Sequence, residues 1–446
     1  MKPCFYWLVV AIFGWCTLMH TGEAATPKAQ AEWTIVAYIQ ADNNLAPFAS
    51  YNINDMQMAP FTDSVNMLVE WDQPNNNKTW RYRIVKGGRI EDASLSAEMG
   101  LNPVQELVDM MAWAKAKYSA KKYATILWNH GSGVLDPRFK PIDKLFRFDP
   151  KLAKNNKQTV PWLEIPGLGI QKKYDPKDPR GILFDDSQNT YATNQDLSTA
   201  FSRIKTEVLG KNIDLVGMDA CLMAMLEVAY QIKDSVNVLV GSEETEPGEG
   251  WAYSRFLTPL CTNPARYGAT ELAKAIVGAY SAFYQGRASD YTQSAIDLSK
   301  VGALKDNVNT FIIKVAACKK ADAARIKTII RRARSSATSF AVSDYIDLYS
   351  FYTALTLQLK KSCATPTAKA ASSKAFTKAA SDLLLVVNTG RQLITQAVIA
   401  NAAGSLYAST VKGIAIYYPR NTVYSSYAST AFAQKTQWIK FVTEYK

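Results

Sequence analysis

The chain has 446 residues, of which 48% are hydrophobic and 11% aromatic, and its formal net charge is +12. This composition excludes a disordered chain, and the length exceeds that of one small domain, so we expect a folded globular protein with a large core. Residues 301–446 hold 20 basic and 6 acidic residues, so the positive charge lies in the last third. The lysines there recur at helical intervals, which is typical of a solvated helix face. We therefore expect no nucleic-acid partner, although binding of an anionic polymer by this region is an alternative.

The first 24 residues have the pattern of a removable export signal. Lys2 precedes an apolar stretch from Phe5 to Met19, and Gly22 and Ala24 place small residues at the two positions that a signal peptidase reads. No later segment supplies about 20 uninterrupted apolar residues, so we expect no stable membrane span in the mature protein. The expected location is secreted or periplasmic.

Residues 25–301 alternate between buried strands and helices, which predicts a mainly parallel sheet flanked by helices. The expected strands, which include a small hairpin, cover 34–41, 65–70, 81–85, 123–128, 181–184, 214–218 and 236–241. The expected helices cover 104–118, 194–204 and 222–232. An irregular stretch, residues 134–180, has no sustained period.

Residues 302–446 predict a second, basic and helix-rich α/β region that packs against the first. Helical spacing covers 305–318, 323–334 and 374–387, and a late apolar run covers 413–417. The expected organisation is therefore a signal peptide at 1–24, an α/β domain at 25–301 and a C-terminal region at 302–446.

Two of the expected strands end beside a residue with reactive chemistry. His130, the only histidine outside the export signal, follows the strand at 123–128, and Cys221 follows the strand at 214–218. Because reactive groups in parallel sheets gather at the carboxyl ends of strands, we expect a thiol nucleophile and its base at one edge. A helix beginning at Cys221 would favour the thiolate.

Each of these residues has an ordinary structural alternative. An isolated cysteine is most often a buried thiol, and a loop histidine can simply bond to backbone. Gly131 and Gly133 favour a function, because they let a ligand approach the backbone and leave an amide that could stabilise an oxyanion. One mature histidine and scattered cysteines do not form a common zinc site, so we expect no metal ligands among them.

Four cysteines remain after removal of the export signal, and an oxidising destination favours pairing of surplus thiols. If Cys221 is a nucleophile it stays free, which leaves room for one disulfide among Cys261, Cys318 and Cys363. The sequence does not choose the pair. Cys318 and Cys363 are favoured because they share the C-terminal region.

An acidic stretch follows the strand at 236–241. Four carboxylates, Glu243, Glu244, Glu246 and Glu249, lie within seven residues. Such a stretch is usually solvated. Together with Asp219, it could instead form a pocket that pairs with arginine or lysine of a substrate.

Three motifs now occur in order: Asn129-His130-Gly131, Asp219-Ala220-Cys221-Leu222-Met223, and a Ser-Glu-Glu stretch that ends in Pro-Gly-Glu-Gly-Trp at 247–251. Over residues 34–300 the chain resembles the clostripain family of cysteine endopeptidases, which is grouped with caspases, legumains and gingipains. The resemblance implies a caspase-like sheet, a Cys-His dyad and cleavage after arginine or lysine.

Carried over by motif, Cys221 would be the nucleophile and His130 the general base and acid. The amides of Gly131 and Cys221 would form the oxyanion hole. Asp219 and Glu249 would bind the substrate, with glutamate at a place where aspartate is more familiar, so the choice between lysine and arginine stays open.

The resemblance also implies protein or peptide substrates and, in some relatives, self-cleavage between the histidine and cysteine strands. The stretch 134–180 offers eleven lysines and arginines for such cleavage. No cofactor is required, but some relatives use calcium, which carboxylates of 243–249 could ligate without a regular calcium-loop spacing. A non-catalytic caspase-like surface protein that binds basic peptides is the alternative function. The oligomeric state stays open.

Overall fold

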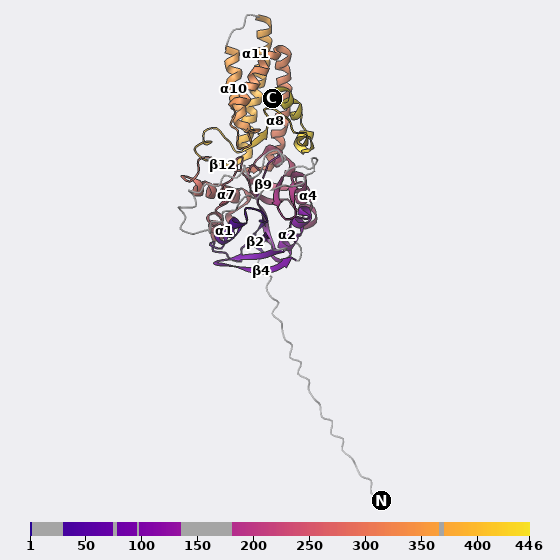
Figure 1. The fold of residues 1–446 in the computed structure, drawn as a ribbon, viewed down its shortest axis with the longest axis vertical. Helices are drawn as coiled ribbons and strands as arrows, with labels where there is room; N and C mark the ends of the chain where they lie inside the picture. Colours follow the sequence, from indigo (N-terminus) through magenta and orange to yellow (C-terminus); the bar gives the residue numbers. More distant parts are fainter. Residues whose placement is uncertain (2–29, 75–77, 96–97, 135–180, 365–369) are drawn as a thin grey trace.

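The computed structural model describes Met1 and residues 30–74, 78–95, 98–134, 181–364 and 370–446 (Figure 1). The expected export signal beyond Met1, and the irregular stretch beyond Val134, lie outside the described residues. No helix in the described part of the chain is long and apolar enough to cross a membrane.

One nine-stranded sheet forms the centre of the molecule, with the strand order β12-β10-β9-β8-β5-β1-β2-β3-β4. Five central strands are parallel: β9 (Val236–Gly241), β8 (Ile213–Asp219), β5 (Ala120–Trp128), β1 (Ala31–Gln40) and β2 (Val65–Asp72). Antiparallel strands extend both edges: β10 (Thr292–Asp297), β12 (Val398–Ala403), β3 (Thr79–Val85) and β4 (Gly88–Leu95). The expected mainly parallel sheet is confirmed.

Helices cover both faces of this sheet, which explains why most side chains of its central strands are buried whichever face they lie on. In β1, Val36 and Tyr38 belong to one core cluster and Ile35 and Ala37 to the other. The first face is covered by α2 (Pro103–Lys117), α4 (Asn194–Arg203) and α5 (Leu226–Ile232). The second is covered by α1 (Ala46–Met56), α6 (Tyr253–Thr262) and α7 (Ala269–Tyr284).

A separate short ladder lies at the carboxyl edge of the sheet. It consists of β6 (Gly181–Asp185) and β7 (Thr190–Thr193), which pair antiparallel. An isolated bridge joins Ile182 of β6 to Gly131, so the strand expected at 181–184 packs against the loop that follows β5.

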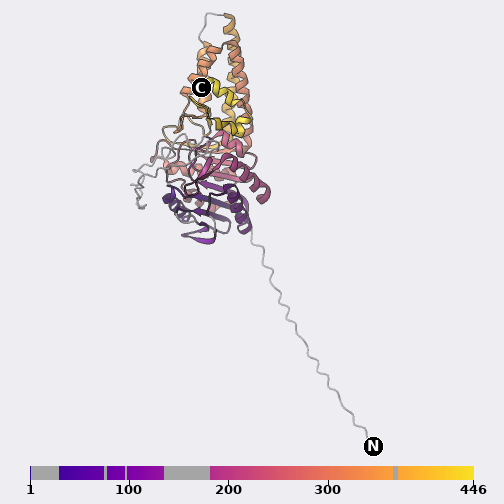
Figure 2. The ribbon, with the colours of Figure 1, turned by 45° about the vertical axis from the view of Figure 1, so that its right-hand side comes forward.

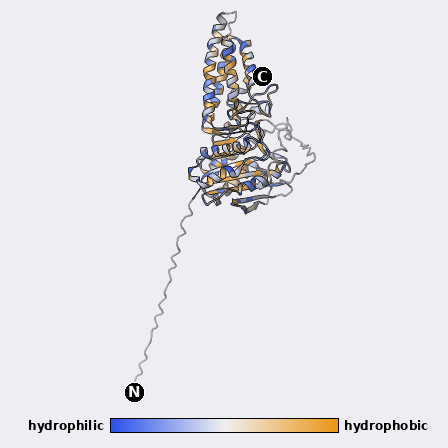
Figure 3. Cartoon of the chain, turned by 90° about the vertical axis from the view of Figure 1, so that its left-hand side faces the viewer, coloured by the Kyte–Doolittle hydropathy of each residue, from blue (hydrophilic) through white to orange (hydrophobic). Residues whose placement is uncertain are grey.

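The C-terminal region forms a helical bundle that projects from the sheet (Figures 1 and 2). Its long helices are α8 (Val301–Ala321), α9 (Ala323–Ser336), α10 (Leu348–Ala364) and α11 (Ala370–Ala397). They carry hydrophilic as well as hydrophobic residues (Figure 3), and Lys360, Lys361, Lys374 and Lys378 are exposed. The solvated helix face that the lysine spacing predicts is therefore present.

This region also contributes to the sheet and to its carboxyl edge. β12 is an edge strand, so residues beyond 302 complete the same sheet as the expected first domain. A short antiparallel pair consists of β11 (Tyr345–Asp347) and β13 (Ala415–Tyr417), and Ala415 forms a β-bridge with Met225. The last two helices of the chain are α12 (Ala431–Gln434) and α13 (Trp438–Tyr445).

The disulfide favoured from the sequence is absent. All four cysteines of the described residues are free; Cys221, Cys261 and Cys318 are buried and Cys363 is half-buried. After burial, the nearby Cys363 contributes to raising the pKa of Cys318 to about 11, so the two thiols are neighbours without a bond.

Candidate active site

The loops that follow β5 and β8 contact each other beyond the carboxyl ends of these two parallel strands. The backbone N–H of Asn129 donates to the carbonyl oxygen of Asp219 at 3.3 Å. A Cβ atom added to Gly131 would lie only 2.3 Å from the carbonyl oxygen of Cys221. The structure therefore brings together the two loops that carry His130 and Cys221, as their positions at strand ends predict.

Gly131→Ala is expected to lower the free energy of unfolding by about 1–3 kcal/mol, the usual cost of overpacking. Its methyl group would meet the Cys221 carbonyl and, at 2.9 Å, the side chain of Met223. Chemical denaturation measures the effect. Gly278→Ala in α7 is the matched control, because nothing lies within 4 Å of an added Cβ there. Equal stability of the two variants would contradict the close contact between the loops.

Cys221 is buried and its thiol is held by backbone. The residue is 3% exposed, and its Sγ atom accepts a hydrogen bond from the backbone N–H of Glu246 at 3.2 Å. Burial raises the pKa of this thiol well above its usual range, and the hydrogen bond from the Glu246 backbone N–H lowers it by a smaller amount. The thiol is therefore uncharged at neutral pH in this conformation.

The helix expected to begin at Cys221 starts later, and the expected help from a helix N-terminus is wrong. α5 begins at Leu226, and Leu222 has φ of 66°, a left-handed conformation that interrupts a helix. Instead, the backbone N–H groups of Leu222 and Ala224 donate to the carbonyl oxygens of Glu244 and Ser242. The segment after Cys221 is thus fixed by pairing with the acidic stretch.

His130 is buried beside an exposed asparagine. Its Nε2 atom lies 2.6 Å from Oδ1 of Asn44, which follows β1. With a carbonyl oxygen as its partner, Nε2 carries the proton and Nδ1 is the basic nitrogen. Burial lowers the pKa of His130 to about 3, so the imidazole is neutral. Asn44 is not among the site residues that the sequence predicts. It nevertheless follows the end of a buried strand, which is the feature that identifies His130.

The loop that carries His130 is held by β6. Asn129 bonds Phe184 through both its side-chain atoms, accepting from the Phe184 N–H at 2.8 Å and donating to its carbonyl oxygen at 2.9 Å. The Phe184 ring also lies edge-on to the His130 ring, with centroids 6.4 Å apart. The position of the imidazole therefore depends on that of β6.

Most of the acidic stretch is buried, and one of its glutamates, Glu246, pairs with Asp219. Glu246 and Asp219 are both buried and share a side-chain hydrogen bond. Asp219 also accepts from the Tyr253 hydroxyl at 2.8 Å, and Glu246 accepts from the Trp251 indole N–H at 3.1 Å. A shared hydrogen bond between two carboxyl groups requires one of them to be protonated.

Glu246 is the protonated member of this pair. Burial, and after it the charge of Asp219, raises the pKa of Glu246 well above its usual range. Burial raises the pKa of Asp219 to about 6. Glu249 is only half-buried, and its backbone oxygen accepts from the side chain of Asn52 at 2.9 Å. Asp219 is thus buried within the acidic stretch, whereas Glu249 lies nearer its surface.

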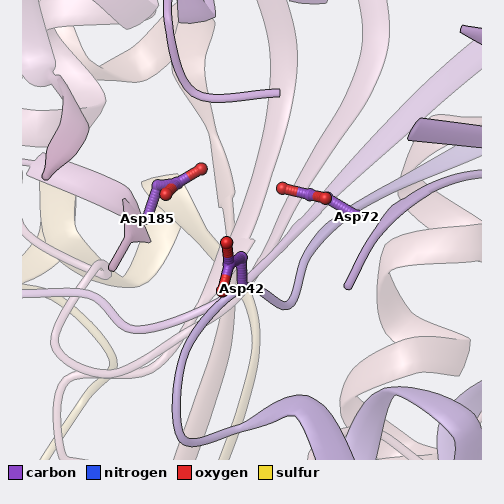
Figure 4. Close-up of side chains that lie close together, drawn as sticks. All are labelled: Asp42, Asp72 and Asp185. Atoms are coloured by element: carbon purple, nitrogen blue, oxygen red, sulfur yellow. The ribbon is translucent and has the colours of Figure 1, made fainter. Parts of the chain in front are cut away.

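The other two glutamates anchor the C-terminal region. Glu244 accepts from the Ala341 N–H at 3.0 Å and the Tyr407 hydroxyl at 2.6 Å, and Glu243 accepts from the Gly413 N–H at 3.1 Å. These glutamates face separate partners and do not form a metal-binding group. Among the described residues, only one group of three or more side chains has the spacing to hold a metal ion, and it lies elsewhere: Asp42, Asp72 and Asp185 (Figure 4).

Comparison with known proteins identifies relatives over most of the chain. The model of the clostripain family matches residues 37–164 and 167–445. Clostripain of Hathewaya histolytica is 23% identical over 252 residues, which are 50% of this chain and 41% of that protein. The match thus spans less than half the length of this relative.

Three crystal structures share the fold. One is a secreted cysteine protease from Bacteroides thetaiotaomicron in complex with an irreversible peptide inhibitor, at 18% identity and a TM-score of 0.56 over 92% of this chain and 99% of that one. Another, iotapain from the same organism, has 15% identity and a TM-score of 0.60 over 91% and 99%. An inactive zymogen from Parabacteroides distasonis has 15% identity and a TM-score of 0.57 over 91% and 98%.

Proposed function

Because the chain belongs to the clostripain family, we propose that it is an exported cysteine endopeptidase that hydrolyses peptide bonds after arginine or lysine. One observation carries the proposal: Gly131 touches the backbone of Cys221, which places the loop of His130 against that of a free cysteine. Relatives that share only the fold would not distinguish catalysis from binding, because one fold can carry many functions.

In the proposed mechanism, Cys221 Sγ attacks the carbonyl carbon of the scissile bond while its proton passes to Nδ1 of His130. The backbone amides of Gly131 and Cys221 stabilise the oxyanion. His130 then protonates the leaving amine, the C–N bond breaks, and water hydrolyses the thioester with His130 again as base. Both residues are buried in the described conformation, His130 at 4% and Cys221 at 3% exposure.

Asp219 would supply the negative charge for the arginine or lysine side chain, with Glu249 nearer the surface. Asp219 is buried. A buried carboxylate has lost its contacts with water, and it binds a cationic side chain strongly only when that side chain compensates for this loss. The acidic neighbours of Asp219 favour a basic over an apolar side chain in this place. Lysine and arginine both satisfy this requirement.

Hydrolysis of paired fluorogenic peptides tests this function. The mature protein is expected to cleave peptides that end in arginine or lysine, and Cys221→Ala is expected to be inactive. The alternative, a non-catalytic protein that binds basic peptides, predicts no turnover by either protein and equal peptide binding by both. Turnover that persists in Cys221→Ala would contradict the proposed nucleophile.

Self-cleavage within residues 134–180 is a second expectation of this proposal, although the stretch beyond Val134 lies outside the described residues. Purified wild type is expected to separate into two chains on a denaturing gel, whereas Cys221→Ala stays intact. Sequencing the new N-termini identifies the cleaved bond, and the first N-terminus tests export by showing removal of residues 1–24. A single wild-type chain of the same length as Cys221→Ala would contradict self-cleavage.

A further inference from the structure

The distal tip is the end of the helical bundle that lies farthest from the sheet (Figures 1 and 2). We define it as the last turns of α8 and α10 and the first turns of α9 and α11, at residues 316–328, 357–364 and 374–381. Arg325 of α9 donates to Oγ of Ser362 at 2.6 Å, and its guanidinium lies 4.3 Å from the centre of the Phe376 ring of α11. These contacts hold the ends of three helices together.

The distal tip is strongly basic. Its three ranges hold eight basic residues and one acidic residue. The acidic residue, Asp322, is the N-cap of α9 and accepts from the Arg325 N–H at 3.0 Å. Lys319 pairs with Glu444 at 2.6 Å. Five further lysines of the tip are exposed and form no salt bridge with another described residue: Lys320, Lys327, Lys360, Lys374 and Lys378.

Helix stability accounts for only part of this charge. A lysine in the last turn of a helix is stabilised by the negative end of the helix dipole, which applies to Lys320 in α8 and Lys361 in α10. Lys374 and Lys378 lie near the start of α11, where the dipole offers a cation no stabilisation. They are also four residues apart, and like charges at this spacing destabilise a helix. The lysines of α11 therefore call for a partner outside the helix.

The composition of the distal tip favours a lipid surface over a nucleic acid. Its exposed, unpaired cations are all lysines, whereas arginine is the usual residue for bidentate recognition of phosphates in nucleic acids. The one aromatic residue in the three ranges is Phe376, which is buried and so offers no surface on which a base could stack.

Apolar side chains lie on the same helix faces as these lysines. Leu357 is 63% exposed and lies four residues before Lys361, and Leu385 is 68% exposed and lies seven residues after Lys378. Residues at these spacings share one face of a helix. Lysines with exposed apolar neighbours suit the boundary between the charged headgroups and the acyl chains of an anionic bilayer.

We propose that the distal tip binds the surface of a bilayer that contains anionic phospholipids, through contact of its lysine ammonium groups with the lipid phosphates. The bundle projects from the sheet, so a chain bound in this way would keep the loops after β5 and β8 away from the bilayer (Figure 1). Binding of the bilayer does not depend on the proposed peptidase function.

Sedimentation with lipid vesicles tests this surface, using the full mature chain with Cys221→Ala so that the chain stays intact. The protein is expected to sediment with vesicles of phosphatidylcholine and phosphatidylglycerol in equal amounts, and not with vesicles of phosphatidylcholine alone. Added sodium chloride should weaken the binding, because salt screens exposed charges. Lys360→Gln/Lys374→Gln/Lys378→Gln in the same background is expected to bind at least about tenfold more weakly, since each lysine near an anionic surface strengthens binding by about fivefold.

Lys86→Gln/Lys274→Gln/Lys300→Gln is the matched control, because it removes the same charge from exposed lysines outside the distal tip. It is expected to bind as the parent does. All six lysines are exposed, so their substitution leaves the packed core untouched. The proposal would be overturned by no binding to the anionic vesicles, by equal binding to neutral vesicles, or by equal losses in the two triple variants. Retention on single-stranded DNA without binding to vesicles would also overturn it and would assign the tip to nucleic acid.

Discussion

The His130→Ala variant is expected to lose at least about 10³-fold in kcat/KM for a peptide that ends in arginine. General acid–base catalysis contributes about 10²–10⁴-fold, and here the base also has to take the proton from a thiol. Burial holds the pKa of that thiol well above its usual range, so very little thiolate forms without His130. Steady-state kinetics of the purified variant measure the loss, and circular dichroism shows whether the fold is kept.

Asn44→Asp provides the matching test of how His130 is positioned. A carboxylate beside Nε2 would raise the pKa of the imidazole, and only the neutral imidazole can act as base. The acidic limb of the kcat/KM profile is therefore expected to move to higher pH than in wild type. An unchanged pH profile, or a His130→Ala protein with a loss of less than tenfold, would contradict the proposed base.

Asp219→Asn is expected to lower kcat/KM for arginine and lysine peptides by at least about 100-fold, because loss of one partner from a buried charge pair costs about 3–5 kcal/mol. Peptides with an uncharged residue at the same place should lose much less. The ratio of kcat/KM for basic peptides to kcat/KM for uncharged peptides reports on binding of the basic side chain alone, since the chemical step is common to both. Kinetics with paired peptides give this ratio directly.

The ratio should also depend on pH. Burial raises the pKa of Asp219 to about 6, and a basic side chain binds the ionised form. Preference for basic peptides is therefore expected to rise as the pH increases through about 6 and to be lost below it. A preference that stays constant between pH 5 and pH 8 would contradict Asp219 as the charged group.

Glu246→Gln separates the two members of the carboxyl pair. Glu246 is already protonated near neutral pH, and a glutamine amide can donate to Asp219 in its place. We therefore expect a change of less than about threefold in kcat/KM at pH 7, in contrast to the loss in Asp219→Asn. A loss as large as that of Asp219→Asn would show that Glu246 itself carries the negative charge.

Much of this site could be predicted because its signals are local. Apolar runs that end in Asn129-His130-Gly131 and Asp219-Ala220-Cys221 define two strands, and parallel strands bring their carboxyl ends to one edge. The strands β2, β5, β8 and β9 lie close to their predicted bounds for the same reason. Strand-end position alone is enough to place His130 and Cys221 in touching loops.

The remaining features depend on partners that are distant in the chain. Residues 222–225 have helical spacing in the sequence. In the structure they pair with residues 242–244 and with Ala415, and because of this pairing the helix begins only at Leu226. Glu246 pairs with Asp219 because the acidic stretch folds back along that segment. The contacts of Asp42, Asp72 and Asp185 join three separate strands, so no spacing within the sequence indicates them.

Labelling with an irreversible peptide inhibitor that ends in arginine or lysine tests the central claim most directly, with the modified residue mapped by mass spectrometry. Cys363 is the internal control, because it is a free and more exposed thiol. We predict one adduct per chain, on Cys221, that is absent from His130→Ala under the same conditions and absent with an uncharged peptide. No adduct on Cys221, even after limited cleavage within residues 135–180, or labelling of Cys363 at an equal rate, would contradict a cysteine endopeptidase built on Cys221 and His130.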